Sequence, residues 1–303
     1  MRRFLKLICI FCFLYCGIIL SVRAFWIYNA PSYLNRNFIN HDIHTIVLGP
    51  SNGATAWNDS LIPHSRNFCE WGDSHATCYN KLKWISEYND NQVDTIAICS
   101  SIIAFIYKPD SCLQSYVEER NSILGYKRFY DYFKYKVDYW KLVFTSFPVL
   151  NLNLKEFRGG YSYLVRERLN HPMVADGINK VLKQMREDDQ DEISEQYLRD
   201  HYKYQVDFLR EIGNYCRDHH KVLIILSPPI YKIPDMIDDS GYRQLIRAEL
   251  GDSALIADYS RFEFPDSTYY GDLEHLNFRG ARYFSKHIAK NGLELKYAID
   301  YCK

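Results

Sequence analysis

The segment "HTIVLGPSNG", residues 44–53, sets the architecture that we expect for this chain. A short run of β-branched and aliphatic residues ends in Gly-Pro-Ser-Asn-Gly, which predicts a buried strand running into a tight turn. Gly49 and Gly53 permit a sharp bend around Ser51. A helix beginning after Ser51 would point its free N–H groups toward a bound anion. The segment therefore predicts a strand-turn-helix unit with a serine at its bend.

Three more runs predict strands: "VDTIAICSS" (residues 93–101), "HKVLIILSPP" (220–229) and "ALIADYSR" (254–261). The first two are continuously apolar, which is typical of parallel strands covered on both faces. Residues 193–220 carry an apolar stripe at helical spacing and lead directly into the strand of residues 220–229, as half of a βαβ unit does. We therefore expect an α/β domain on a parallel sheet over residues 43–303.

Residues 112–170 predict a helical, aromatic-rich insertion in this domain. An amphipathic helix on the membrane or over the active site fits the aromatic side chains and lysines. A buried helix of an inserted subdomain fits them as well and is the more common arrangement. The acidic residues 186–192 would suit a helix N-terminus, although a solvated face is the simpler interpretation.

The N-terminus is basic and then apolar, with an uncharged run over residues 7–22. About 20 apolar residues cross a bilayer, and preceding basic residues favour an inside N-terminus. We expect a transmembrane anchor within residues 1–23, a juxtamembrane linker over residues 24–42 and an exported domain after it. A cleaved signal peptide is the alternative, although "SVRAF" is a poor cleavage site.

Composition narrows the classes of partner and cofactor. Acidic and basic residues balance at 37 each, so we expect no nucleic-acid partner. Three of the nine cysteines, Cys9, Cys12 and Cys16, lie in the N-terminal apolar run. The six outside it include no Cys-x-x-Cys pair, and no histidine stands at zinc-finger spacing, so we expect neither a metal nor another cofactor. An exported compartment permits disulfides. Cys69 with Cys78 is one candidate pair, and the sequence leaves the connectivity open.

Asp272 and His275 stand three residues apart in "YYGDLEHLNFRGARYFSKHI", residues 269–288. In one interpretation Asp272 caps a helix that starts near Asn277, and His275 is polar filler. In the other, His275 is the base for a serine nucleophile and Asp272 orients His275. Ser51 favours the second interpretation, because sites on open α/β sheets lie at the carboxyl ends of the strands. We therefore predict a catalytic triad of these three residues.

The order of these blocks, strand-Gly-x-Ser and then Asp-x-x-His-Leu-Asn, resembles the SGNH/GDSL hydrolase superfamily from residue 44 to the region of residue 290. The resemblance implies a three-layer α/β/α fold with a flavodoxin-like parallel sheet. Pro50 replaces the aspartate of the family's Gly-Asp-Ser motif. The N-terminal anchor and "LIILSPPIYKIP" are similar to a membrane-anchored branch found with cell-envelope polysaccharide and teichoic-acid modification.

The resemblance also implies a second block, which "NFCEWGDSH", residues 67–75, fits. Gly72 is its candidate amide donor to the oxyanion, and Asn67, which begins the block, is another candidate donor. The same stretch contains Gly-Asp-Ser-His and could be mistaken for the nucleophile motif. We reject Ser74 as the nucleophile because the residues before it do not form an apolar strand.

The family's third block, Gly-x-Asn, is missing from "AICSSIIAF", residues 97–105. One lost oxyanion donor can cost roughly 3 to 4 kcal/mol of transition-state stabilisation. Ser100, Ser101 or Asn52 would have to replace the asparagine.

We thus expect a membrane-anchored, exported serine esterase or O-acyltransferase that acts on acyl groups, acetyl foremost, of a cell-envelope glycan or a small ester. Ser51 would attack the carbonyl, His275 would move the proton, Asp272 would orient His275, and the amides of Ser51 and Gly72 would bind the oxyanion. The alternative is a catalytically weakened domain that binds a glycan or a multi-pass membrane acyltransferase.

Overall fold

The computed structural model shows an α/β domain and describes the chain in several stretches, which are residues 2–37, 42–88, 92–102, 105, 194–231 and 238–297. Within them, one six-stranded sheet has the order β2-β1-β3-β4-β5-β6. The first five strands pair in parallel, and β6 pairs antiparallel with β5. The strands are β1 (Thr45–Leu48), β2 (Ser65–Asn67), β3 (Thr95–Cys99), β4 (Val222–Ser227), β5 (Ala254–Asp258) and β6 (Lys296–Tyr297).

The four predicted strands are the inner strands β1, β3, β4 and β5, so the expectation of an α/β domain on a parallel sheet is confirmed. The two edge strands were not predicted. Strand β2 has three residues, Ser-Arg-Asn, and β6 has two exposed ones. Edge strands of this length need little burial, so hydrophobic pattern does not reveal them.

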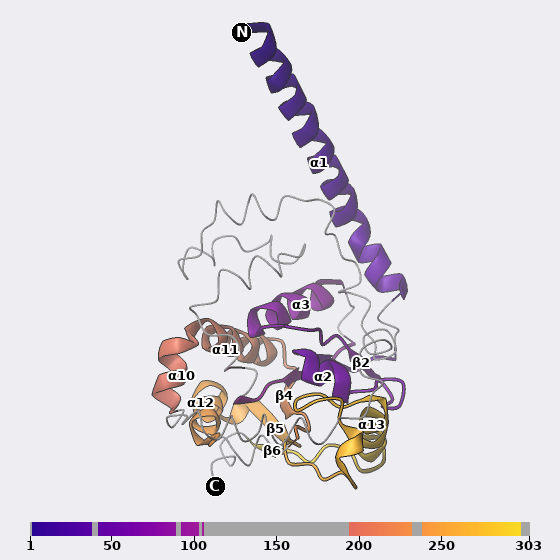
Figure 1. The fold of residues 1–303 in the computed structure, drawn as a ribbon, viewed down its shortest axis with the longest axis vertical. Coiled ribbons are helices and arrows are strands. Elements are labelled where there is room, and N and C mark those ends of the chain that lie inside the picture. The colour runs from indigo at the N-terminus through magenta and orange to yellow at the C-terminus, as the bar shows by residue number, and fades with distance from the viewer. Residues whose placement is uncertain are drawn as a thin grey trace.

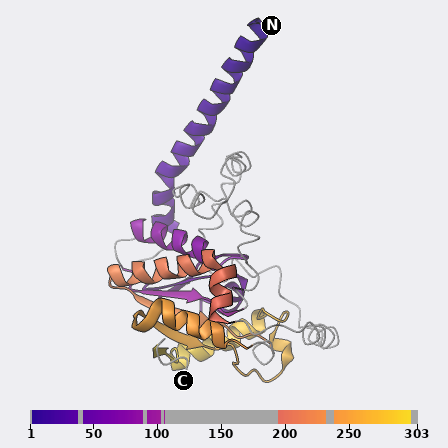
Figure 2. The same cartoon turned by 90° about the vertical axis from the view of Figure 1, so that its left-hand side faces the viewer.

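Helices cover both faces of the sheet, because alternate side chains of each inner strand enter separate apolar clusters. In β1, Ile46 and Leu48 belong to one cluster and Val47 to the other, and all three are fully buried. The first cluster lies under α3, α10, α11 and α12, the side from which Figure 2 is viewed. The second lies under α2 and α13. These helices are α2 (Ser51–Ala56), α3 (His75–Tyr88), α10 (Glu195–His201), α11 (Lys203–Asp218), α12 (Ser240–Leu250) and α13 (Phe278–Asn291).

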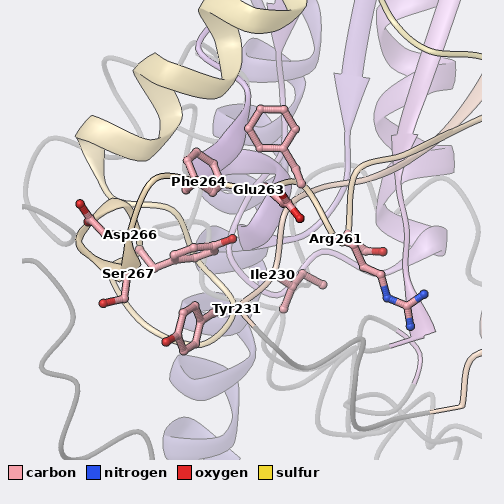
Figure 3. A pocket seen from close by; sticks show the side chains of 10 residues that line it. Ile230, Tyr231, Arg261, Glu263, Phe264, Asp266 and Ser267 are labelled. Atoms are coloured by element: carbon pink, nitrogen blue, oxygen red, sulfur yellow. The ribbon is translucent and has the colours of Figure 1, made fainter.

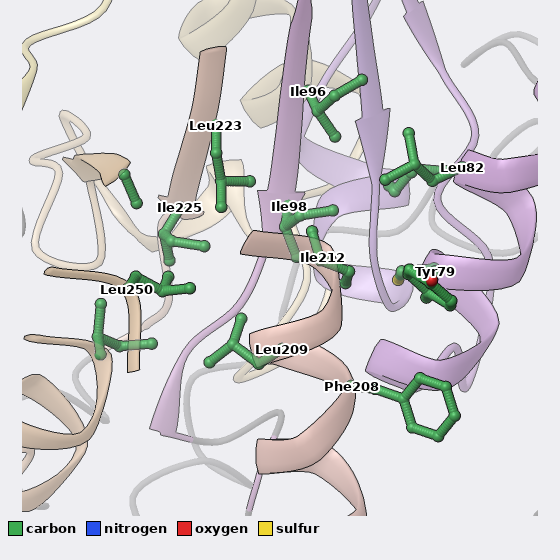
Figure 4. Packing of buried hydrophobic residues seen from close by; sticks show 14 of the residues in the cluster. Tyr79, Leu82, Ile96, Ile98, Phe208, Leu209, Ile212, Leu223, Ile225 and Leu250 are labelled. Carbon is green, nitrogen blue, oxygen red and sulfur yellow. The ribbon is translucent and has the colours of Figure 1, made fainter. Parts of the chain in front are cut away.

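The larger cluster is built mainly from aliphatic side chains. Figure 4 shows Leu209 and Ile212 of α11 beside Ile98 of β3. All three are fully buried. Burial of a leucine or isoleucine side chain contributes about 1.5–3 kcal/mol, so this helix–sheet contact is a main source of stability.

The single helix predicted over residues 193–220 is in fact two helices, α10 and α11. Tyr202 separates them because its backbone leaves the helical region, with φ −132° and ψ 32°. The Tyr202 ring is buried, and its centroid lies 6.2 Å from that of Phe105. The apolar stripe continues across the break because both helices face the same cluster, so periodicity alone could not locate it.

The N-terminal residues form α1 (Arg2–Asn37), which Figure 1 shows extending away from the sheet. The large apolar side chains between Phe4 and Ile18 are exposed. Among the helices of the described residues, none has the length and apolar character that crossing a membrane requires. The helix continues past the expected boundary at residue 23. The predictions for residues 112–170 and 186–192 lie outside the described residues.

Candidate active site

The serine turn is formed by close backbone approach between β1, α2 and β3. A Cβ on Gly49, which has φ 150°, would lie 2.5 Å from the Cβ of Cys99. A Cβ on Gly53 would lie 2.4 Å from the Sγ of Cys99 and 2.7 Å from the Sγ of Cys69. All three distances are far below van der Waals contact. Glycine at these two positions therefore allows α2 to begin with Ser51 directly at the carboxyl end of β1.

The residue that departs from the family motif, Pro50, is the N-cap of α2. Its φ of −75° suits the ring of proline, and its carbonyl accepts hydrogen bonds from the N–H groups of Gly53 and Ala54, at 3.1 and 3.2 Å. Pro50 therefore supports the turn through its backbone.

The two cysteines that flank Gly53 are free thiols. The Sγ atoms of Cys69 and Cys99 lie 3.9 Å apart, and burial raises the pKa of the Cys69 thiol well above its ordinary value. Cys78 is also free and buried. The suggested Cys69–Cys78 disulfide is therefore wrong for this structure: Cys69 instead packs against Cys99 beneath the serine turn.

Asp272 and His275 lie on a turn that its own hydrogen bonds close. The Oδ1 atom of Asp272 accepts the N–H groups of Glu274 and His275, at 2.8 and 2.9 Å. The N–H of Gly271 donates to the carbonyl of His275, at 2.8 Å. Asn277, not Asp272, is the N-cap of α13, and its side chain accepts the N–H of Gly280. The helix-cap interpretation of Asp272 is therefore wrong.

The structure brings the three predicted triad residues together. The Ser51 Oγ lies 2.7 Å from the Nε2 of His275. The other ring nitrogen, Nδ1, lies 2.8 Å from both carboxylate oxygens of Asp272. A carboxylate only accepts, so Nδ1 carries the proton and Nε2 accepts the hydroxyl of Ser51. His275 is 8% exposed, and its ring centroid lies 4.8 Å from that of Trp71.

The charge of Asp272 is stabilised in the folded chain. Burial on its own would raise the pKa of this carboxyl. The hydrogen bond from His275 and the electrostatic attraction of its ring N–H, together with the backbone N–H groups of Glu274 and His275, outweigh burial and lower the pKa below its ordinary value. Asp272 is therefore ionised at neutral pH and can orient His275.

This lowered pKa predicts an acid-dependent contribution to stability. An aspartate in the unfolded chain has a pKa of about 3.9. Asp272 thus stabilises the fold fully above that pH, and the effect is lost as the pH falls through the lower folded-state pKa. We expect the melting temperature of wild type to exceed that of Asp272→Asn at neutral pH and the gap to narrow in acid. Thermal unfolding of both proteins down to about pH 2.5 measures this, and a gap that widens would contradict it.

Two of the predicted oxyanion donors are committed elsewhere. The side-chain amide of Asn67 donates to carbonyl oxygens of α2 and the residue after it, at 2.8 Å to Trp57 and 3.2 Å to Gly53. Its Oδ1 accepts the N–H of Cys69. Asn67 holds the end of α2 in place, so the prediction that it supplies an oxyanion donor is wrong.

Ser100 faces the apolar cluster under α3, α10, α11 and α12, on the other side of the sheet from α2. Its Oγ lies 3.1 Å from the Nε2 of His75 and accepts the hydroxyl of Tyr242 at 2.9 Å. The Nδ1 of His75 donates to the carbonyl of Gln205, so Nε2 must accept the hydroxyl hydrogen of Ser100. Ser100 therefore has no hydrogen left to donate to a substrate, and its predicted role is also wrong.

Other donors remain candidates. Among the described residues, neither the N–H of Ser51 nor the side-chain nitrogen of Asn52 donates a hydrogen bond. The Asn52 Oδ1 accepts the N–H of Gly53 at 2.8 Å, which directs the amide nitrogen to the other side. Gly72 has φ 74° and follows Trp71, whose ring contacts His275. Ser101 is buried, and its carbonyl accepts the N–H of Phe105.

The rejection of Ser74 agrees with its position. The residues before it form only a short polar strand, β2, which ends at Asn67. Ser74 lies well beyond that strand. Its hydroxyl accepts the N–H of Thr77, 3.2 Å away, in the first turn of α3. Ser74 is a helix-capping residue.

A buried ion pair holds the loop that carries Trp71 and Gly72. Lys81 of α3 is 2% exposed, and its Nζ lies 2.6 Å from Asp73 and 3.4 Å from Glu70. The same Nζ donates to the carbonyl of Phe68. Burial alone would lower the pKa of Lys81, but the two carboxylates outweigh it and raise the pKa above its ordinary value. Trp71 beside His275 was not predicted, although it directly precedes the predicted Gly72.

Comparison with protein-family models, with curated protein sequences and with solved structures found no match to this chain.

Proposed function

We propose that this protein is an SGNH-like serine esterase or O-acyltransferase with Ser51 as its nucleophile. The observation that carries the proposal is the continuous hydrogen-bond chain from Ser51 Oγ through both nitrogens of His275 to Asp272. Serine, histidine and carboxylate in this order are the groups that acyl transfer through a covalent intermediate requires. The serine and the histidine stand 224 residues apart, so the chain brings them together only by folding.

The proposed reaction has two halves. As the Oγ of Ser51 bonds to the acyl carbon, its proton moves to the Nε2 of His275, and Asp272 stabilises the imidazolium. The tetrahedral oxyanion collapses, the bond from carbon to the leaving oxygen breaks, and His275 returns the proton to that oxygen. Water or a sugar hydroxyl then attacks the acyl-serine with His275 as base again, which releases an acid or a new ester and restores Ser51.

The oxyanion donors in this proposal are the N–H groups of Ser51 and Gly72, with the side-chain amide of Asn52 in place of the family's asparagine. Ser51 and Asn52 have donors that no described residue uses. The strand order 2-1-3-4-5 supports a flavodoxin-like, three-layer arrangement, in which ligands bind where the order reverses, between β1 and β3. Ser51 follows β1 directly.

The proposed substrate is an acylated glycan of the cell envelope, and acetyl is the acyl group that we favour. The proposal includes an exported domain held at the membrane by the N-terminal helix, supported by the exposed apolar side chains between Phe4 and Ile18. Transfer rather than hydrolysis would link the protein to a multi-pass membrane acyltransferase that supplies or receives the acyl group.

Labelling with a fluorophosphonate tests the nucleophile. We expect the full chain to be labelled and to hydrolyse p-nitrophenyl acetate, because an activated serine attacks both reagents. Ser51→Ala should lose the label. Ser74→Ala is the matched control. It removes the serine of the Gly-Asp-Ser-His stretch, which we rejected as the nucleophile, and should keep the label. Labelling that persists in Ser51→Ala would remove Ser51 from the mechanism.

The same experiment separates the proposal from its alternative, a weakened domain that binds a glycan or an acyltransferase partner. The use of Asn67 and Ser100 for structural hydrogen bonds favours this alternative, because two of the predicted oxyanion donors are then absent. A folded wild-type chain that neither takes the label nor hydrolyses the acetyl ester would support it.

A further inference from the structure

A cavity of about 500 Å³ lies beside the turn that carries Asp272 and His275, lined by residues 230–231, 260–264, 266–267 and Tyr270. Its volume falls within the range typical of small-molecule sites. One wall follows β4 and the other follows β5, so the cavity lies at the carboxyl ends of neighbouring parallel strands. That is the edge of the sheet where Ser51 follows β1.

The cavity is joined to the acid–base turn through the backbone. The N–H of Tyr231 donates to the carbonyl of Leu273, at 3.0 Å, within the turn itself. Tyr270 lies two residues before Asp272 and forms an antiparallel bridge with Leu276, directly after His275. A molecule held in the cavity would therefore contact the same loop that positions the catalytic pair.

Aromatic rings form much of the wall. The Tyr270 ring lies 5.1 Å from the rings of both Tyr231 and Phe264, in edge-to-face contacts. Phe262 lies 5.0 Å from Phe264. Rings packed against one another in this way are held rigidly and present flat apolar surfaces of the kind on which the CH faces of a sugar stack.

Tyr270 presents a hydroxyl to which no described residue forms a hydrogen bond. The residue is only 5% exposed, yet its hydroxyl forms no hydrogen bond with any described residue, and it is not among the buried polar atoms cut off from solvent. Because Tyr270 also lines the cavity, its hydroxyl is available to a molecule bound there. A buried polar group with no protein partner is costly unless water or a ligand satisfies it, so Tyr270 offers one hydrogen bond to an occupant.

Charged groups lie around the aromatic wall. Figure 3 shows Arg261 on one side of the labelled side chains and Asp266 with Ser267 on the other. Glu263 is exposed and forms no ion pair or hydrogen bond with a described residue. A carboxylate and a guanidinium suit hydroxyl groups, which donate to carboxylates and accept from arginine. Glu263, which no described cation neutralises, disfavours an anionic ligand.

We propose that this cavity is a subsite for an uncharged hexose residue of the substrate glycan. The inference rests on the proposed function for its link to acyl transfer, but sugar binding itself requires no chemistry at Ser51. The aromatic wall would carry the ring faces, while Tyr270, Glu263 and Arg261 would bind hydroxyl groups. A hexose bound there would place the rest of the glycan against the loop of Asp272 and His275.

Titration with unacylated sugars tests the subsite. The full chain with Ser51→Ala, in a detergent that has no sugar head group, is titrated by calorimetry with maltotetraose, cellotetraose and tetra-N-acetylchitotetraose. We expect saturable binding of at least one of them. Loss of one hydrogen bond in Tyr270→Phe or Glu263→Gln should weaken that binding about 2- to 10-fold. Tyr297→Phe, which removes an exposed hydroxyl on β6, is the matched control and should bind as strongly as its parent.

Three results would overturn the subsite. The first is no binding of any of the three tetrasaccharides, and the second is binding by Tyr270→Phe and Glu263→Gln as tight as that of their parent. The third is tighter binding of tetragalacturonic acid, whose hexose rings carry carboxylates, than of the three neutral tetrasaccharides. The failures of the two proposals are distinguishable. Sugar binding without fluorophosphonate labelling would keep the subsite and reject the nucleophile, and the reverse result would do the opposite.

Discussion

Exchange of His275 for alanine, or of Ser51 for alanine, is expected to lower kcat for ester hydrolysis by about 10⁶-fold, the loss known when either residue of a serine–histidine pair is removed. The reason lies in the geometry: in the proposed mechanism, the serine loses its proton through the 2.7 Å contact between Ser51 Oγ and His275 Nε2. The two changes together should cost little more than either alone, because both remove the same step. Initial rates with p-nitrophenyl acetate measure the effect.

Asp272→Asn should have a smaller effect, about 10⁴-fold at most, since an amide in place of the carboxylate favours the wrong histidine tautomer. The Asp272 side chain is half exposed, so in the variant water can replace part of its interaction with His275. His201→Ala on α10 is the control for the histidine change, because it removes an imidazole far along the chain from the triad. A His275→Ala variant that keeps more than a hundredth of the wild-type kcat would exclude His275 as the general base.

Exchange of Lys81 for methionine is expected to lower the free energy of unfolding by about 3–5 kcal/mol, because it leaves the buried Asp73 carboxylate without its cation. The Lys81 side chain is 2% exposed and that of Asp73 is fully buried, so water cannot replace the lost partner. The pKa of Lys81 is raised above its ordinary value of about 10.4. Its contribution is therefore complete below that pH and is lost only as the pH rises above it.

Urea unfolding of Lys81→Met measures this loss, and Lys286→Met, at an exposed position of α13, is the matched control. The double change Lys81→Met with Asp73→Asn should be more stable than Lys81→Met alone, because it removes the unpaired charge. If the double variant were less stable than wild type by the sum of the two single losses, the broken ion pair would not be the cause of the lower stability of Lys81→Met.

Much of the fold could be predicted from the sequence because the inner strands are continuously apolar. Runs such as "IVL" in β1 and "LIIL" in β4 contribute side chains to both clusters, and few other structures bury every residue of such a run. The edge strand β2 could not be found this way, since Ser65, Arg66 and Asn67 need only one neighbour and carry no apolar signal.

The residues of the triad could be predicted from the sequence, but two of the candidate oxyanion donors, Asn67 and Ser100, were assigned wrongly. Motif and chain order identify Ser51, Asp272 and His275. Sequence cannot tell whether an amide or hydroxyl is already hydrogen-bonded to the protein. Asn67 and Ser100 have suitable side chains at suitable places in the chain, yet one is bonded to the end of α2 and the other to His75. Hydrogen-bond partners of this kind are settled by tertiary packing.

The members of the triad meet over very different distances along the chain. Asp272 and His275 are three residues apart in a turn that its own backbone bonds close, so this pair can form early and locally during folding. The contact of His275 with Ser51 closes a loop of 224 residues and requires β1, α2 and the C-terminal turn to be assembled. Recovery of esterase activity during refolding would therefore report the last long-range step, after helical signals and local turns have returned.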